Sequence, residues 1–396
     1  MIKKNIMIYG GEFFNKGAQA MSFTTISRLK DEFPNHNITF VSEMDSRRPK
    51  SELENYNFEI ITDPFARNNF IGENFIRKLM NKSQRHNPKS VKNLLYETDY
   101  LFDISGYALS SQWEQKRVDS YIIRLKVAND MGIKTIIMPQ SMGPFDFNED
   151  VVINIKEALQ KVVVINPRES QGVEDLKDIG VSENVKKIPD MVLTNQTPIN
   201  WNNIYRKKEK EKQYEVLSNS VAIVPNAQNF KYGNKDEVLE IYRKTIQYLR
   251  KRNINIYLTK HSHNDTEACH LIKNMFTDDS GVKMIVDDMT PKEFENLIKQ
   301  FNFIIGSRFH SVVHAYKVGT PSIILGWATK YIELAQLFNQ NNYVFDVRNN
   351  INEELFLEKI QNMINNYKDE SETILSKLNN VKKYGDPFNY AFKRLK

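Results

Sequence analysis

The chain has 396 residues, of which 40% are hydrophobic and 11% aromatic, and this content excludes an intrinsically disordered protein. Its 55 basic and 49 acidic residues leave a formal net charge of +6 that is spread along the sequence, so charge alone does not indicate a protein that binds nucleic acid or a membrane surface. The single cysteine, Cys269, excludes an intramolecular disulfide framework and a cysteine-rich zinc site.

The first half of the chain alternates short apolar runs with longer amphipathic stretches, a pattern that predicts βα units. We expect strands at Asn5–Tyr9, Ile38–Ser42, Tyr100–Ile104, Thr135–Pro139, Val162–Asn166 and Val185–Ile188. We expect helices at Ala18–Glu32, Gln112–Met131, Glu149–Gln160 and Gln171–Ile179. Residues 162–165 are apolar without alternation, which is typical of a parallel strand that is covered on both faces.

The second half of the chain repeats this rhythm. We expect strands at Val221–Val224, Ile254–Thr259, Lys283–Val286, Phe303–Ile305 and Ser322–Leu325. We expect helices at Lys235–Lys251, Asp265–Met275, Pro291–Gln300, His310–Val318 and Lys330–Phe338. Two independent βα runs of similar length predict an α/β protein with two Rossmann-like, doubly wound domains.

The segment between the two runs is highly charged, and its core, Arg206–Lys212, is typical of a solvated linker. We therefore predict an N-terminal domain over residues 1–200, a linker over 201–220, a C-terminal domain over 221–350 and a helical tail over 351–396. The Asn-rich, basic segment Ser46–Lys92 has weak periodicity, so we expect an insertion or a mobile excursion there.

Two loops follow predicted strands of the first domain, at the sheet edge where open α/β sheets bind their ligands. The first, Gly10–Ala20, contains Asn15 and Gly17; glycines let the backbone approach a ligand ahead of a helix N-terminus. The second, Gln140–Pro144, is a loop fixed by proline and glycine. A plain structural turn explains either loop equally well.

Arg168 follows the predicted strand at residues 162–166 and precedes a helix. Its planar guanidinium can hold a phosphate or a carboxylate with two parallel hydrogen bonds. An ion pair with Glu169 or Asp190 is the structural alternative, and both interpretations remain open.

The most informative motif is Gly306–Ser311, where a buried strand leads directly into a helix. The helix N-terminus favours negative charge, Arg308 can hold an anion, and His310 can exchange a proton near neutral pH. A capping or packed histidine is the structural alternative. His314 follows one turn later, but no glutamate or cysteine completes a zinc-binding set, so we expect no metal.

Two further positions complete the candidates. His261 begins the loop His261–Asp265 after a predicted strand, where helix capping is the alternative explanation. Lys330 begins a predicted helix, where a solvated lysine is the alternative.

These motifs together resemble the polysaccharide pyruvyl transferase family, in the family's order over about residues 8–338. The resemblance is carried by the segments Gly11–Ala20, Gln140–Pro144, Arg168–Ser170 with Pro189–Asp190, His261–Asp265, and Gly306–Ser311 with Gly319, Pro321 and Lys330. It implies a GT-B-like architecture, in which two Rossmann-like domains face a cleft and a C-terminal helix crosses back to the N-terminal domain.

The resemblance also implies a reaction. Pyruvate would pass from phosphoenolpyruvate, as co-substrate, to two hydroxyls of one sugar in a cell-surface polysaccharide or its lipid-linked precursor, without a metal or a cofactor. His310 would act as the acid, and Arg308 and Arg168 would hold the donor. The other substrate-binding residues would be Ser307, Ser311, Lys330, Asn15, Gly17, Gln140, Asp190 and His261. The C-terminal domain would be the phosphoenolpyruvate side and the N-terminal domain the acceptor side.

Two other functions remain open on the sequence. One is a metal-independent GT-B glycosyltransferase that uses a sugar nucleotide, and the other is a non-catalytic relative that binds a carbohydrate or an anion. No apolar run approaches the ~20 residues that span a bilayer, and the run near the N-terminus, Ile6–Tyr9, is too short for a signal peptide. We expect a cytoplasmic protein that binds no nucleic acid, with peripheral contact at the inner face of the membrane left open.

Overall fold

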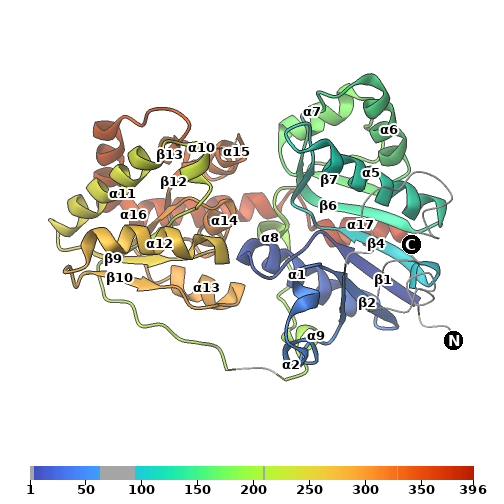
Figure 1. Cartoon of the computed structure of the whole chain (residues 1–396), viewed down its shortest axis with the longest axis horizontal. Helices are drawn as coiled ribbons and strands as arrows, with labels where there is room; N and C mark the ends of the chain where they lie inside the picture. The colour runs from blue at the N-terminus through green and yellow to red at the C-terminus, as the bar shows by residue number, and fades with distance from the viewer. Residues whose placement is uncertain (1–3, 63–93, 208–209, 328) are drawn as a thin grey trace. The chain divides into compact units, whose positions relative to one another are not determined.

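The computed structural model describes residues 4–62, 94–207, 210–327 and 329–396 (Figure 1). The chain forms two compact units, each built on a parallel sheet. Unit 1 comprises Met1–Phe13, Met21–Glu209 and Tyr384–Lys396, and unit 2 comprises Phe14–Ala20 and Lys210–Lys383. The prediction of two Rossmann-like domains is confirmed.

Unit 1 contains a seven-stranded sheet with the order β3-β2-β1-β4-β6-β5, in which β7 also pairs with β6. Its strands are β1 (Lys4–Tyr9), β2 (His36–Val41), β3 (Glu59–Ile61), β4 (Thr98–Asp103), β5 (Tyr107–Leu109), β6 (Lys134–Met142) and β7 (Val164–Pro167). All of these pairings are parallel, which places the carboxyl ends of the strands at one edge of the sheet.

Helices connect and follow the strands of unit 1. They are the greater part of α1 (Lys16–Glu32), α2 (Lys50–Leu53), α5 (Gln115–Asp130), α6 (Glu149–Gln160), α7 (Ser170–Asp178), α8 (Met191–Thr194), α9 (Trp201–Ile204) and α17 (Pro387–Leu395). The last helix starts with a proline, and the Asp386 carboxylate accepts hydrogen bonds from the backbone N–H groups of Phe388 and Asn389. Asp386 also forms a buried ion pair with Arg28 of α1, which ties the C-terminal helix to unit 1.

Unit 2 contains a six-stranded parallel sheet with the order β10-β9-β8-β11-β12-β13. Its strands are β8 (Ser220–Val224), β9 (Asn255–Thr259), β10 (Val282–Ile285), β11 (Phe303–Gly306), β12 (Ser322–Gly326) and β13 (Val344–Asp346). Its helices are α10 (Asn229–Tyr232), α11 (Lys235–Arg250), α12 (Thr266–Lys273), α13 (Pro291–Ile298), α14 (Phe309–Lys317), α15 (Thr329–Leu337) and α16 (Glu353–Lys382).

The sheet of unit 2 is covered on both faces, as the uninterrupted apolar strands predict. On one face, Val221 and Ile223 of β8 belong to a core cluster with apolar residues of α11, α12 and α16. On the other face, Ala222 and Val224 belong to a cluster with apolar residues of α13 and α14. Successive side chains of one strand point to opposite faces of the sheet, so β8 contributes residues to two separate hydrophobic cores.

One expected strand was wrong. Val185–Ile188 is not a strand, and Val185 makes only an isolated bridge to Ile165 beside β7. Within Ser46–Lys92, residues 63–92 lie outside the described residues, but the described part holds α2 and the edge strand β3. The helical tail is confirmed, and its two helices divide between the units, with α16 in unit 2 and α17 in unit 1.

Candidate functional site

The residues predicted to act fall into two groups. Unit 2 brings eight of them into one body, namely Asn15, Gly17, His261, Ser307, Arg308, His310, Ser311 and Lys330. Unit 1 holds the other three, namely Gln140, Arg168 and Asp190.

Arg308 is the N-cap residue of α14, immediately after β11. Its Nε and Nη2 atoms both donate to the carboxylate of Asp265, at 2.9 Å and 2.6 Å for the shortest pairs. Asp265 is fully buried and also accepts the backbone N–H groups of Ser262 and Ala227. Because the carboxylate is fixed by the backbone, it orients the guanidinium, whose side chain remains 17% exposed.

His310 lies in the first turn of α14, where the helix dipole favours an anion. Gly17 packs directly against its imidazole, since an added Cβ at Gly17 would stand less than 3.0 Å from Cγ of His310. The Gly17 N–H donates to Oδ1 of Asn15 at 3.0 Å, which fixes the backbone at the start of α1. The predicted pair Asn15 and Gly17 therefore shapes the surroundings of His310.

The segment Phe14–Ala20 is joined to the loop after β9. The Lys16 N–H donates to the carbonyl of His261 at 3.1 Å, and the His263 N–H donates to the carbonyl of Phe14 at 3.1 Å. Asn15 and Ser262 form an isolated antiparallel bridge. This segment therefore forms a fixed wall of the candidate site in unit 2.

Two lysines that the sequence analysis missed add positive charge to this region. Lys16 is a buried residue of the segment Phe14–Ala20. Lys260 is also buried, and it pairs with Asp288 at 3.2 Å. Burial opposes ionisation of Asp288, but Lys260, Lys16 and His263 outweigh it and lower the pKa of this carboxyl. The position of Lys16 between Asn15 and Gly17, in a loop after a predicted strand, could have indicated it as a site residue. Nothing in the sequence around Lys260 indicates such a role.

Lys330 lies in the first turn of α15 among aromatic rings. Its Nζ atom is 5.5 Å from the ring centroid of Phe309 and 5.7 Å from that of Trp327, within the range of a cation–π contact. Phe309 directly precedes His310, so Lys330 brings a further positive charge to the start of α14.

His261 is only 1% exposed, and neither of its ring nitrogens has a hydrogen-bond partner among the described residues. Its ring lies 5.6 Å from that of His314, whose Nδ1 donates to Glu295 at 2.9 Å. Burial, with the nearby charges of His314, His310 and Arg308, holds the pKa of His261 well below its usual value of 6.5. His261 is therefore neutral at physiological pH, and its contact with substrate stays a prediction.

The two serines of the motif are buried and already bonded. The hydroxyl groups of Ser307 and Tyr242 are hydrogen-bonded at 2.8 Å, and the Ser311 hydroxyl donates to the carbonyl of Arg308 at 2.6 Å. These bonds fix the turn between β11 and α14. The contact of Ser307 and Ser311 with substrate stays a prediction.

In unit 1, Arg168 lies in a buried ion network at the carboxyl ends of β6 and β7. Its Nε atom donates to Glu169 at 2.8 Å, its Nη1 atom to Asp190 at 3.2 Å, and its Nη2 atom to the Ser141 hydroxyl at 2.8 Å. Asp190 also caps α8, and Gln140 is buried with its amide donating to the Tyr121 hydroxyl. The ion-pair alternative for Arg168 is thus the arrangement in the structure.

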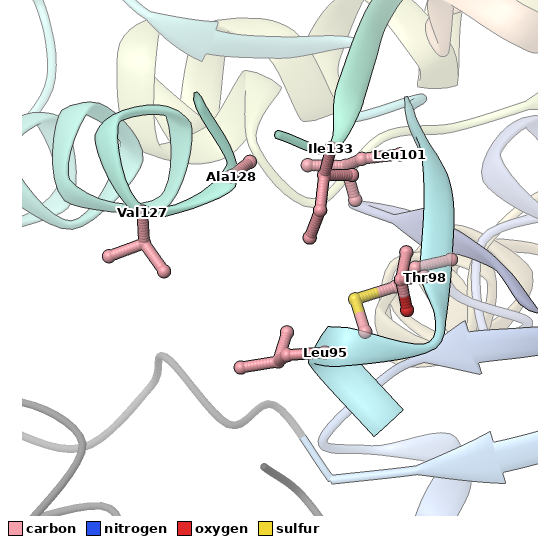
Figure 2. Close-up of a pocket in the computed structure, with 7 residues that line it drawn as sticks. Leu95, Thr98, Leu101, Val127, Ala128 and Ile133 are labelled. Atoms are coloured by element: carbon pink, nitrogen blue, oxygen red, sulfur yellow. The ribbon is translucent and has the colours of Figure 1, made fainter. Parts of the chain in front are cut away.

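A small apolar pocket lies elsewhere in unit 1, between α5 and β4 (Figure 2). Its lining residues are Met7, Leu95, Thr98, Leu101, Val127, Ala128 and Ile133. Its free volume of about 10 Å³ is close to that of one water position, so it offers no room for a sugar. It contains none of the predicted site residues.

Across the described ranges of the chain, no cluster of three or more His, Cys, Asp and Glu residues could hold a metal ion. None of the helices in these ranges is long and apolar enough to cross a membrane.

Comparison with known proteins gives a family and a fold. A family model described as polysaccharide pyruvyl transferase matches residues 15–329. No curated protein matches the sequence of the chain. Among solved structures, UDP-GlcNAc 2-epimerase from Methanocaldococcus jannaschii has a TM-score of 0.58 at 15% sequence identity, covering 91% of this chain and 92% of its own.

Two further structures show the same likeness. The same epimerase solved with UDP-GlcNAc and UDP has a TM-score of 0.52 at 14% identity, covering 91% of this chain and 92% of its own. A glycosyltransferase from Rickettsia africae has a TM-score of 0.58 at 13% identity, covering 99% of this chain and 98% of its own. At these identities the likeness shows the fold alone, which is GT-B-like.

Proposed function

The chain belongs to the polysaccharide pyruvyl transferase family and is a transferase, and we propose that it moves pyruvate from phosphoenolpyruvate to two hydroxyls of one sugar, which forms a ketal. The acceptor is a sugar of a cell-surface polysaccharide or of its lipid-linked precursor. The observation that carries the donor assignment is the start of α14. There a guanidinium oriented by Asp265 and a histidine packed on Gly17 share one helix N-terminus.

The donor carries a phosphate and a carboxylate, and the candidate site in unit 2 suits both. The oriented Arg308 supplies donors for oxyanions, and the helix dipole at the start of α14, with Lys16 and Lys330, adds positive charge. This set needs no contribution from Arg168, whose guanidinium is engaged by carboxylates in unit 1.

The chemistry requires one acid and one base. His310, in its protonated form, gives a proton to the methylene carbon of phosphoenolpyruvate, so that C3 becomes a methyl group and C2 becomes an electrophile. One sugar hydroxyl adds to C2 and loses its proton. The bond from C2 to the phosphate oxygen then breaks, and the second hydroxyl adds to C2 to close the ketal, its proton passing to the departing phosphate. The neutral imidazole formed in the first step can accept a hydroxyl proton, which returns His310 to its starting state.

The test is phosphate release from phosphoenolpyruvate by the purified full-length chain. We expect release only when an acceptor sugar is present, and we expect EDTA to leave it unchanged. His310→Ala should slow release by about 100-fold or more, the usual contribution of a general acid. His270→Ala is the matched control, because His270 is an exposed histidine on α12 of the same unit.

Full activity in His310→Ala would exclude the acid role, and release without acceptor would exclude the transfer reaction. A glycosyltransferase that uses a sugar nucleotide is the second candidate, because one neighbour in fold was solved with UDP-GlcNAc and UDP. Thermal stabilisation by UDP-GlcNAc but not by phosphoenolpyruvate would favour it over our proposal.

A further inference from the structure

An aromatic pair stands at the carboxyl edge of the sheet in unit 2, outside the groups assigned above. Tyr232 ends α10, which follows β8, and Trp327 directly follows β12. Strands β8 and β12 flank β11, the strand that delivers Arg308 and His310. Figure 1 shows α10, β12 and α15 together at this end of unit 2.

The two rings are stacked. Their centroids are 4.2 Å apart and their planes differ by 21°. The short helix that carries Tyr232 is hydrogen-bonded to β12, since the buried side chain of Asn229 donates to the carbonyl of Leu325 at 3.0 Å. The preceding loop is anchored as well, because Asn226 donates to the carbonyl of Ser307 at 3.0 Å. The pair is therefore held rigidly beside the turn that begins α14.

The aromatic pair is partly exposed to solvent. Tyr232 is 41% exposed and Trp327 is partly buried on the core. Two ammonium groups accompany the rings, with Nζ of Lys231 5.8 Å from the Tyr232 centroid and Nζ of Lys330 5.7 Å from the Trp327 centroid. Lys330 also contacts the ring of Phe309, so it links the pair to the proposed donor site.

We propose that the Tyr232–Trp327 pair is the platform on which the pyranose ring of a phosphorylated sugar acceptor packs, which places this part of the acceptor in unit 2 and not in the N-terminal domain that the resemblance implies. The face of an aromatic ring carries partial negative charge, and the C–H groups on one face of a pyranose are apolar and slightly positive. The two lysines suit a phosphate or diphosphate attached to that sugar. A sugar held here would lie beside the helix that carries His310, as transfer between donor and acceptor requires.

This inference rests on the proposed function, because the family supplies the carbohydrate class of the acceptor. A nucleobase also stacks on aromatic rings. The family's polysaccharide acceptor favours the sugar, and the experiment includes a nucleotide to separate the two.

The fluorescence of Trp327 can report ligand binding at the pair. The chain has three tryptophans, so the difference in emission between wild type and Trp327→Phe isolates its signal. We would titrate both proteins with the 1-phosphates of glucose, N-acetylglucosamine, galactose and mannose. Inorganic phosphate, methyl α-glucopyranoside and UMP are the comparison ligands.

At least one sugar 1-phosphate should change the Trp327 emission and bind more tightly than inorganic phosphate or the neutral glycoside. Tyr232→Ala should weaken that binding by about 10-fold, the scale of one lost stacking contact. Tyr384→Ala is the matched control, since Tyr384 is 42% exposed in unit 1 and should leave binding unchanged.

Three results would contradict the proposed platform. The first is that none of the four sugar phosphates binds, and the second is that Tyr232→Ala binds them as the wild type does. The third is a change in Trp327 emission with UMP that equals the change with the sugar phosphates. Phosphate release measured on the same preparations keeps the two proposals apart. Sugar-phosphate binding without release from phosphoenolpyruvate contradicts the proposed reaction only. Acceptor-dependent release with an acceptor KM that Tyr232→Ala does not change contradicts the platform only.

Discussion

Gly17 lies against the imidazole ring of His310, so close that no side chain fits between them. The two residues are far apart in sequence and meet within unit 2. A glycine at this place keeps the ring in its position at the start of α14 while the backbone of α1 passes over it. The smallest side-chain addition therefore tests whether the position of His310 matters.

Gly17→Ala should displace the His310 ring and lower kcat for phosphate release by about 100-fold, because small misplacements of a reacting group have effects of this size. The overpacking should destabilise the chain by about 1–3 kcal/mol. Steady-state kinetics and urea unfolding measure the two effects. Gly132→Ala is the control for a destabilising glycine substitution away from the site: an added methyl there meets nothing within 4 Å, but the φ of +74° strains it, so we expect lower stability with wild-type kcat. Wild-type kcat in Gly17→Ala would contradict the role assigned to the contact.

Asp265 should matter for donor binding through Arg308. Asp265→Asn keeps the shape of the side chain but removes the charge that holds the guanidinium. We expect KM for phosphoenolpyruvate to rise about 10-fold or more, with a smaller change in kcat. Asp346→Asn is the matched control, since Asp346 makes the same two-pronged contact with the surface residue Arg348. Equal KM values in the two variants would exclude an orienting role for Asp265.

Glu295 should stabilise unit 2 in a pH-dependent way. Burial opposes its ionisation, but the hydrogen bond and charge of His314 and the charge of Lys317 outweigh it and lower its pKa from 4.5 to about 2. Because the folded pKa is lower than the unfolded one, its contribution of roughly 3 kcal/mol is complete above pH 4.5 and is lost as the pH falls toward 2.

Glu295→Gln should accordingly lower the urea midpoint at pH 7, and the gap from wild type should shrink as the pH falls from 4.5. Glu358→Gln serves as the control, because Glu358 is exposed and pairs only with its neighbour Lys359 among the described ion pairs. A gap that is the same at pH 7 and pH 3 would show that the ionised carboxylate is not the source of the stability.

Substitutions of Arg168 distinguish a structural role of this residue from a role in substrate binding. Arg168→Met leaves Glu169 and Asp190 without their buried counter-charge, so we expect a loss of about 3 kcal/mol in the free energy of unfolding of unit 1. Arg168→Lys keeps the charge but cannot make all of these contacts, and it should retain the wild-type KM for phosphoenolpyruvate. A raised KM in a fully stable Arg168→Lys would restore the donor-holding interpretation.

The architecture was largely predictable from the sequence, because buried parallel strands have a simple signature. Short apolar runs predicted the central strands of both units, and the helix predicted at Glu149–Gln160 has the observed bounds of α6. The edge strands β3, β5 and β13 have only three residues each, too few for a periodic pattern. Val185–Ile188 has a β-branched residue at each end, but its two central residues are lysines, Pro189 follows it, and only one bridge forms.

The candidate site was predictable at the level of motifs but not of side chains. Parallel strands deliver their carboxyl ends to one edge, which brings the loops after β9 and β11 together. Nothing in the sequence says that the hydroxyls of Ser307 and Ser311 are hydrogen-bonded within unit 2, so these bonds could not be predicted. Lys260 was missed because one lysine among 55 basic residues has no distinguishing pattern.

The assembly of unit 2 from two stretches of chain has a consequence for how the protein can be made. Phe14–Ala20 leaves the ribosome long before α14 is synthesised, so the packing of Gly17 on His310 must await nearly the whole chain. A fragment of residues 210–383 would carry Arg308 and His310 but lack the wall that shapes their surroundings. Truncations that look like single domains in the sequence should therefore yield inactive protein, and supplying residues 14–20 on a separate peptide is a route to restore them.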